Sequence, residues 1–288
     1  MVCFDNTEGN IYRPPSEADS FILRLTIGCS HNQCVFCSMY KDVSFKIQTP
    51  AAIMAQINQA ASYFPDLHRV FLADGNALML PTPNLLEILD RLKATFPKLN
   101  RVTSYGSPRD LLNKTPEELE LLAKSGLKMI YMGIESGDDR VLSLMNKGVT
   151  ATEIIIAGEK VIKAGIKLSA MIILGLGGKE LTKTHAINTG RIVGEISPER
   201  LGILTLMREE GTLLERLIGE GKFTPLTPLA TILELEQMIT EMNVRKPCIV
   251  RSNHVSNLLP LAGTLPRNKG ELLQQVRQVI GVLNKREI

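Results

Sequence analysis

The sequence predicts an α/β fold built around a parallel sheet, and three observations lead to this prediction. Short apolar, β-branched segments recur at intervals of about thirty residues, at 21–28, 69–78, 101–107, 128–135, 167–174 and 200–207. Segments with helical periodicity lie between them, and parallel strands require such crossover helices. No proline- or glycine-rich linker interrupts the alternation, so the strands are expected to share one domain.

Capping signals mark where the intervening helices begin. Thr49 and Pro50 have the residue types of an N-cap and a first helical position, and Thr82 and Pro83 are expected to begin the next helix. Residues 115–118 (TPEE) form a capping box with proline at the first helical position. These signals predict that helices connect the strands.

The alternation loosens after residue 208. Helical stretches, a strand-like segment at 248–253, a loop rich in proline and glycine, and a last helix from near Lys269 complete the chain. We therefore expect a core at residues 1–208 and a mainly helical extension, residues 209–288, packed on that core.

Composition limits the class of protein. The chain is 44% hydrophobic and can bury a substantial core, but its longest apolar runs are strand-sized and predict no membrane span. Residues 1–10 lack the pattern of a secretory signal, so a cytoplasmic protein is expected. The net charge of +3 comes from 33 basic and 30 acidic residues that are dispersed along the chain, so nucleic acid binding is not indicated.

Three of the five cysteines, Cys29, Cys34 and Cys37, lie in the segment GCSHNQCVFCSMYK with the spacing C-x4-C-x2-C. In a reducing compartment, an odd cysteine count with such clustering argues against a disulfide framework. Three thiolates from one loop suit an iron-sulfur cluster that keeps one iron without a protein ligand. A zinc site is the other possibility, because His31 could supply a fourth ligand. The remaining pair, Cys3 and Cys248, is too small for a second cubane cluster.

The placement of this segment after the first predicted strand resembles the radical S-adenosylmethionine (radical SAM) superfamily. In that family the first strand ends in a three-cysteine loop, usually C-x3-C-x2-C, with an aromatic residue before the last cysteine. Phe36 matches the aromatic residue, whereas the gap between Cys29 and Cys34 is one residue longer. The resemblance implies an incomplete (β/α)6 TIM-like barrel in which Cys29, Cys34 and Cys37 hold a 4Fe-4S cluster with S-adenosylmethionine (SAM) at its open iron.

The function implied by the resemblance is that of an iron-sulfur oxidoreductase or transferase. Reductive cleavage of SAM would give a 5'-deoxyadenosyl radical that abstracts hydrogen from an unidentified small-molecule or peptide substrate, with a flavodoxin- or ferredoxin-type electron donor. The alternative from another class is a non-catalytic zinc-binding interaction protein that uses Cys29, His31, Cys34 and Cys37.

Later strand ends supply candidate SAM contacts, because sites on parallel βα barrels lie at the carboxyl ends of strands. Residues 73–76 stand where the family has a Gly-Gly-Glu-like segment, and residues 107–110 follow the third strand. Residues 133–148 resemble the GIESG…VL…MNKG segment of the branch containing coproporphyrinogen dehydrogenase, the tRNA methylthiotransferases and the Elp3-like enzymes. Residues 172–180 resemble the family's glycine-rich segment beside adenine. The SAM-site residues implied are Phe36, Asp74, Gly75, Asn76, Arg109, Glu135, Ser136, Arg140, Lys147, Leu174 and Gly175.

Simpler structural roles are open for each of these residues. Asp74 and Gly75 are typical of a turn, and Ser136 with Asp139 has the spacing of a capping box. Charged residues such as Arg140 and Lys147 are usually solvated on a helix.

The extension also contains candidates for substrate contacts, which depend on its closing the open side of the barrel. They are Arg251, Asn253, His254 and Asn257, and the alternative is a hydrogen-bonded turn network. His68 and His185 are expected to be ordinary surface or capping residues.

Overall fold

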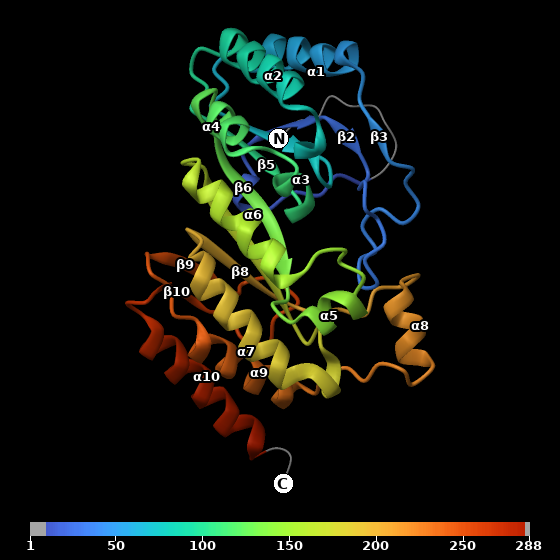
Figure 1. Cartoon of the computed structure of the whole chain (residues 1–288), viewed down its shortest axis with the longest axis vertical. Helices are drawn as coiled ribbons and strands as arrows, with labels where there is room; N and C mark the ends of the chain where they lie inside the picture. The colour runs from blue at the N-terminus through green and yellow to red at the C-terminus, as the bar shows by residue number, and fades with distance from the viewer. Residues whose placement is uncertain (1–9, 286–288) are drawn as a thin grey trace. The chain divides into compact units, whose positions relative to one another are not determined.

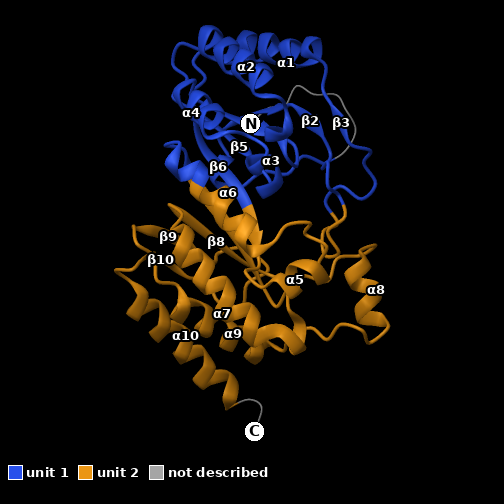
Figure 2. Ribbon diagram, viewed as in Figure 1, with its two compact units in different colours: residues 1–32, 39–132, 160–167 blue, residues 33–38, 133–159, 168–288 orange. Residues whose placement is uncertain are grey.

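Figure 1 shows a computed structural model of the chain, which describes residues 10–285. The chain divides into two compact units, shown in different colours in Figure 2. Unit 1 consists of residues 1–32, 39–132 and 160–167, and unit 2 consists of residues 33–38, 133–159 and 168–288. The predicted separation of a core from an extension at residue 208 stays a prediction. Residues 1–9, which include Cys3 and nearly all of the segment searched for a secretory signal, lie outside the described residues.

Unit 1 contains a parallel sheet with the strand order β1-β4-β5-β6. Its strands are β1 (Phe21–Arg24), β4 (Arg69–Ala73), β5 (Arg101–Tyr105) and β6 (Leu127–Glu135), the last of which continues into unit 2. A short antiparallel ribbon joins β2 (Thr26–Ile27) to β3 (Lys46–Ile47). The central strands are apolar because both faces are covered, and Val70, Phe71 and Leu72 are almost completely buried.

Three helices of unit 1, those that start at residues 50, 82 and 116, begin where the capping signals predict. The helices of this unit are η1 (Pro15–Glu17), α1 (Pro50–Tyr63), η2 (Ala77–Met79), α2 (Thr82–Thr95), α3 (Pro108–Leu112) and α4 (Pro116–Lys124). The Thr49 side chain accepts a hydrogen bond from the amide of Ala52, and Thr115 forms a reciprocal capping box with Glu118. Local sequence therefore determines the start of these helices.

Unit 2 contains strands in the order β7-β8-β9-β10. They are β7 (Lys167–Leu174), β8 (Arg200–Thr205), β9 (Cys248–Arg251) and β10 (Ala262–Leu265). The pairs β7–β8 and β8–β9 are parallel, whereas β10 is antiparallel to β9. The segment predicted to be a loop rich in proline and glycine contains the strand β10, so that prediction is wrong there. This segment satisfies the free edge of β9 and buries Leu265.

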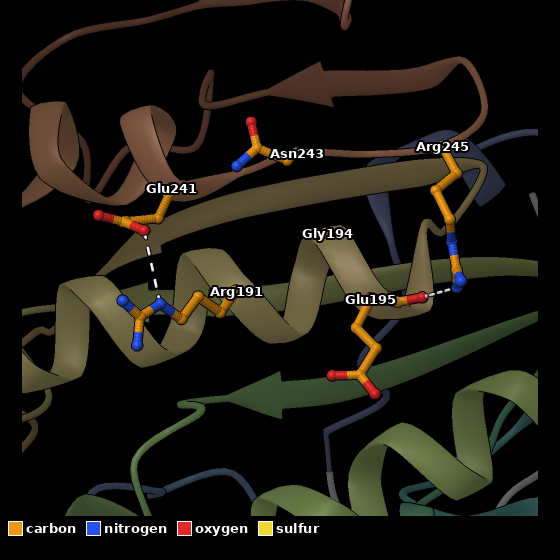
Figure 3. A pocket seen from close by; sticks show the side chains of 6 residues that line it. All are labelled: Arg191, Gly194, Glu195, Glu241, Asn243 and Arg245. Carbon is orange, nitrogen blue, oxygen red and sulfur yellow. Dashed lines mark hydrogen bonds and ion pairs between the residues drawn. The ribbon is translucent and has the colours of Figure 1, made fainter.

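The helices of unit 2 are α5 (Asp139–Leu144), α6 (Ala151–Lys163, which ends in unit 1), α7 (Gly178–Ile196), α8 (Leu213–Gly219), α9 (Pro228–Glu241) and α10 (Lys269–Asn284). Helices α7 and α9 approach closely because α7 carries glycine at the contact. A Cβ atom on Gly190 would lie 2.5 Å from Met238 O, and one on Gly194 would lie 3.0 Å from Asn243 N. Figure 3 shows a pocket of about 250 Å³ beside this contact, lined by Arg191, Gly194, Glu195, Glu241, Asn243 and Arg245.

The fold class is therefore the predicted one, since all six strands expected from the apolar repeats are present and helices connect them. Over residues 10–285, no helix has both the length and the apolar composition needed to cross a membrane.

Candidate functional site

Cys29 lies in unit 1, beside the loop that follows β4. Gly75 N donates a hydrogen bond to Gly28 O at 3.2 Å, and Ser30 N donates to Asn76 Oδ1 at 3.1 Å. A Cβ atom on Gly75 would lie only 2.9 Å from Cys29 Cβ, closer than van der Waals contact allows. Glycine is thus required at this position, and the loop after β4 packs directly on the first cysteine.

Asp74 lies in the same loop and is completely buried. Its carboxylate accepts hydrogen bonds from Arg24 Nη2 at 2.8 Å, from Gly28 N at 3.3 Å and from the Tyr40 hydroxyl at 3.0 Å. Burial raises the pKa of Asp74, while Arg24 and the other donors lower it in part. Burial and then the nearby Asp74 raise the pKa of Tyr40 far above its usual value, so its hydroxyl keeps the proton that it donates.

Asn76 connects the cysteine segment to the loop after β5. Its amide nitrogen donates to Ser30 Oγ at 2.6 Å and to Asp110 Oδ1 at 3.2 Å. Asp110 also forms a reciprocal capping box with Ser107 at the start of α3, and its burial raises the pKa of its carboxyl. The S-x-x-D spacing of residues 107–110 was the available sequence signal for Asp110, whereas Arg109 is exposed.

Residues 33–38, which carry Cys34 and Cys37, belong to unit 2. Val35 N donates to Met145 O at 3.0 Å, and Val35 O accepts from Leu214 N at 3.0 Å. Val35 is buried in an apolar cluster, and Phe36 packs against that cluster. The other buried members are Val141, Met145, Leu176, Leu214 and Phe223. The aromatic residue before the last cysteine therefore has a packing role within unit 2.

The three clustered cysteines fit a cofactor that needs soft ligands. Cys29, Cys34 and Cys37 are half-buried and form no disulfide, while Cys248 is buried in β9. Over residues 10–285, no three or more His, Cys, Asp or Glu side chains lie together so that they could hold a metal ion. By residue type and sequence spacing, three thiols on one loop suit a 4Fe-4S cluster with three protein ligands.

Glu135 and Lys147 form an ion pair in unit 2. Lys147 Nζ lies 2.9 Å from Glu135 Oε1, and both side chains are only 13% exposed. Glu135 has a φ of 62°, in the left-handed region, and a Cβ atom on Gly133 would overlap its carboxylate. The chain thus accepts backbone strain to place this carboxylate beside Lys147, whereas Arg140 is exposed and donates to Thr184.

Ser136 belongs to a buried hydrogen-bond network around His185. The predicted capping box of Ser136 and Asp139 is wrong, because Asp138 is the N-cap of α5. Ser136 Oγ instead accepts from Asp138 N at 3.0 Å and lies 2.8 Å from His185 Nδ1. His185 Nε2 lies 3.0 Å from the carbonyl oxygen of Ile173. Since a carbonyl only accepts, Nε2 carries the proton and Nδ1 accepts from Ser136.

The prediction that His185 is an ordinary surface or capping residue is also wrong, because the ring is completely buried. Its position on the inner face of an amphipathic helix explains the difference. Burial lowers the pKa of His185 to about 4, so the ring is neutral near pH 7. The 3.8 Å separation between His185 Nε2 and Glu234 Oε1 is therefore not a salt bridge at that pH. His68 is exposed, as predicted.

Glu234 holds the end of β7, and no motif or spacing in the sequence pointed to it. This buried carboxylate on α9 accepts from Gly175 N and from the Thr182 hydroxyl, each at 2.5 Å. Burial raises the pKa of Glu234 to about 7. Gly175 has a φ of 78°, and it follows Leu174, which is buried in β7. The glycine-rich turn predicted to flank adenine is thus held by a residue of α9.

The candidate substrate residues make internal contacts. Asn257 accepts from the Thr205 hydroxyl at 2.8 Å and donates to Ile203 O at 2.7 Å and Ser252 O at 3.0 Å. Arg251 donates to Val250 O at 2.8 Å, and Asn253 and His254 are exposed. The alternative of a turn network therefore describes Asn257 well.

Comparisons with known proteins identify the family. Residues 23–185 match the model of the Radical SAM superfamily. An uncharacterised protein of Methanocaldococcus jannaschii is 28% identical over 69% of this chain and 64% of that protein. The tRNA uridine(34) acetyltransferase of Dehalococcoides mccartyi is 26% identical over 57% of this chain and 35% of its own length. The chain thus spans less than two thirds of either relative.

Solved structures agree with this assignment at the level of the fold. Coproporphyrinogen III oxidase from Escherichia coli has a TM-score of 0.57 at 17% identity, covering 77% of this chain and 51% of that one. Methylornithine synthase has a TM-score of 0.53 at 16% identity, covering 91% and 81%. The predicted TIM-like α/β fold is confirmed. Because the family match spans more than half of its residues, the chain belongs to the radical SAM superfamily, whose enzymes use a 4Fe-4S cluster and SAM.

Proposed function

We propose that the protein cleaves SAM reductively and uses the product to abstract hydrogen from a substrate that is still unidentified. The observation that carries this proposal is the set of three half-buried thiols, Cys29, Cys34 and Cys37, on the loop after the first parallel strand. When bound there, a reduced 4Fe-4S cluster supplies the electron that converts SAM into methionine and a 5'-deoxyadenosyl radical.

The residues of this chain have distinct proposed roles in binding. Cys29, Cys34 and Cys37 would hold the cluster as thiolates. Glu135, kept in place by Lys147, would contact SAM, and the backbone at Leu174 and Gly175 would lie beside adenine. Gly75, Asn76, Arg109, Ser136 and Arg140 remain proposed contacts on the basis of the family resemblance alone.

The same resemblance supports a cytoplasmic protein that receives electrons from a flavodoxin- or ferredoxin-type donor. The substrate is proposed to be a small molecule or peptide. Arg251, Asn253, His254 and Asn257 remain proposed substrate contacts, and the exposed Asn253 and His254 are the better candidates because the amide of Asn257 is occupied by internal partners.

A matched pair of cysteine variants tests the proposal. Cys34→Ala removes a proposed ligand, and Cys248→Ala removes a buried thiol of β9 that lies outside the segment. After anaerobic reconstitution with iron and sulfide, the wild type and Cys248→Ala should form 5'-deoxyadenosine from SAM with dithionite, and Cys34→Ala should not. Equal product from Cys34→Ala would refute the ligand assignment.

Metal analysis of the same preparations separates this proposal from the zinc alternative. A brown protein with sulfur-to-iron charge-transfer absorption supports the cluster. A colourless protein that retains one zinc per chain would instead favour a structural site of Cys29, His31, Cys34 and Cys37.

A further inference from the structure

We propose that Asp74 is a positioning residue that joins both flanks of the cysteine loop and thereby holds Cys29 ready for cluster assembly. The cysteine loop comprises residues 28–40, from Gly28 before the first cysteine to Tyr40 after the last. The inference rests on the proposed function, but it assigns Asp74 to the support of the cluster loop rather than to SAM contact.

The two carboxylate oxygens of Asp74 bind opposite ends of the loop. Oδ2 accepts from Gly28 N at 3.3 Å, at the residue directly before Cys29. Oδ1 accepts from the Tyr40 hydroxyl at 3.0 Å, beyond the last cysteine. One side chain therefore bridges residues that are twelve positions apart in the sequence, and it restricts the freedom of the chain between them.

Neighbouring contacts keep Asp74 and Tyr40 in place. Asp74 N donates to Thr26 Oγ1 at 3.3 Å, so the backbone of Asp74 is itself attached to the strand that leads into the loop. Asn32 Nδ2 donates to Tyr40 O at 2.7 Å and provides a second connection across the base. Tyr12 packs edge-on against the Tyr40 ring, with the centroids 5.4 Å apart. The loop base is thus a small, specific network rather than one isolated bond.

Burial and charge explain why this carboxylate suits a supporting role. Arg24 is 1% exposed and Asp74 is 0% exposed, so each charge depends on the other for compensation. Arg24, Gly28 and Tyr40 together occupy three of the roughly four acceptor positions of a carboxylate. With those positions filled from within unit 1, the carboxylate is engaged in holding the loop rather than in binding the amino group of SAM.

A matched set of variants tests this role. Asp74→Ala removes both connections, and Tyr40→Phe removes one of them without changing a charge. Glu17→Ala is the control, because Glu17 is a completely buried carboxylate of the same unit that pairs with Arg101 at 2.6 Å and bonds Tyr131 at 2.5 Å, outside the loop. It reports the general effect of breaking a buried ion pair in unit 1.

Two measurements are made on each protein. The first is the rate at which iodoacetamide alkylates Cys29 in the apoprotein, followed by peptide mass spectrometry, with Cys248 as the internal reference for global unfolding. The second is iron and sulfide content, together with SAM affinity, after anaerobic reconstitution. Because two connections are lost, iodoacetamide should alkylate Cys29 roughly tenfold faster in Asp74→Ala than in Glu17→Ala. After reconstitution, Asp74→Ala should contain less than about half the iron found in Glu17→Ala. Tyr40→Phe should show a smaller change in the same direction.

Two results would overturn the inference. The first is that Asp74→Ala and Tyr40→Phe have the same Cys29 alkylation rate and the same iron content as Glu17→Ala. The other is normal reactivity and full iron content with weakened SAM binding, which would make Asp74 a SAM contact. If the wild type took up no iron, the proposed function would fail, but alkylation of the apoprotein would still decide whether Asp74 holds the loop.

Discussion

Glu234 should give the protein a measurable pH dependence of stability. The carboxyl ionises near pH 4.5 in an unfolded chain and near pH 7 in the folded protein, because burial disfavours its charge. Between these values the unfolded state binds fewer protons than the folded state, so the free energy of unfolding falls as pH rises. The contribution is fully present below pH 4.5 and is lost as pH rises through about 7. At about 1.4 kcal/mol per pH unit, the loss is about 3 kcal/mol.

The substitution Glu234→Gln isolates this effect. The glutamine oxygen can still accept from Gly175 N, and its amide can donate to the Thr182 hydroxyl, so the 2.5 Å contacts have neutral counterparts. His185 lies 3.8 Å away and titrates in an overlapping range with the opposite effect on stability, so the wild-type curve alone is not diagnostic. The informative quantity is the difference in unfolding free energy between wild type and variant at each pH.

Urea unfolding of the apoproteins at pH 5, 6, 7 and 8, followed by circular dichroism, measures that difference. Relative to Glu234→Gln, the wild type should lose about 2.5 kcal/mol between pH 5 and pH 8, since part of the change falls below pH 5. Glu241→Gln is the control for a lost charge on the same helix, because Glu241 is 25% exposed and pairs with Arg191 at the surface. A difference for Glu234→Gln that stays constant within about 0.5 kcal/mol would refute the buried-carboxyl argument.

Three further predictions concern glycine contacts and the buried histidine. Gly75→Ala should lower iron uptake and cost about 1–3 kcal/mol of stability, because the new Cβ would lie 2.9 Å from Cys29 Cβ; Gly219→Ala, in open space on α8, should have neither effect. Gly133→Ala should displace Glu135 from Lys147, so both Gly133→Ala and Glu135→Ala should weaken SAM binding in equilibrium dialysis while iron content stays normal. Unchanged affinity for SAM would show that the ion pair is not part of the SAM site. The contribution of His185 to the free energy of unfolding of the wild type should fall by about 3 kcal/mol as pH drops from 6.5 through 4, because the lowered pKa of His185 in the folded protein lets the unfolded state bind the proton first. His185→Gln should remove this loss. An equal loss of stability in the variant over the same pH range would contradict the argument.

The parallel strands and capped helices could be predicted because their signals are local. The apolar repeats located the strands β1, β4, β5, β6, β7 and β8. Thr49 and Thr115 cap helices as their residue types indicate. β10 was missed because its pairing with β9 depends on an available strand edge, and four residues such as Ala262–Leu265 carry little periodicity. Local sequence patterns therefore predict strands and helices that carry their own signal, and they miss short strands that form only by pairing with a neighbouring strand.

In the candidate site, the sequence predicts functional residues better than it predicts the partners of those residues. Asp74 and Glu135 could be selected as functional candidates from their motifs, but their partners could not. Arg24 and Tyr40 lie far from Asp74 in sequence, and each would pass for an ordinary strand or loop residue. Buried carboxylates must be compensated by donors, but the sequence does not reveal which donors the fold brings within 3 Å.

Residues of unit 2 that lie beyond the family match contact segments of the candidate site. The matched region ends at residue 185, yet Leu214 donates to Val35 between two of the cysteines, and Glu234 holds Gly175. Burying Val35 requires apolar partners, and part of that surface comes from Leu214 and Phe223. A chain that ended at the family boundary would leave the backbone oxygen of Val35 and the amide of Gly175 without these partners. Residues beyond 208 therefore help to hold the segment of Cys34 and Cys37 within unit 2.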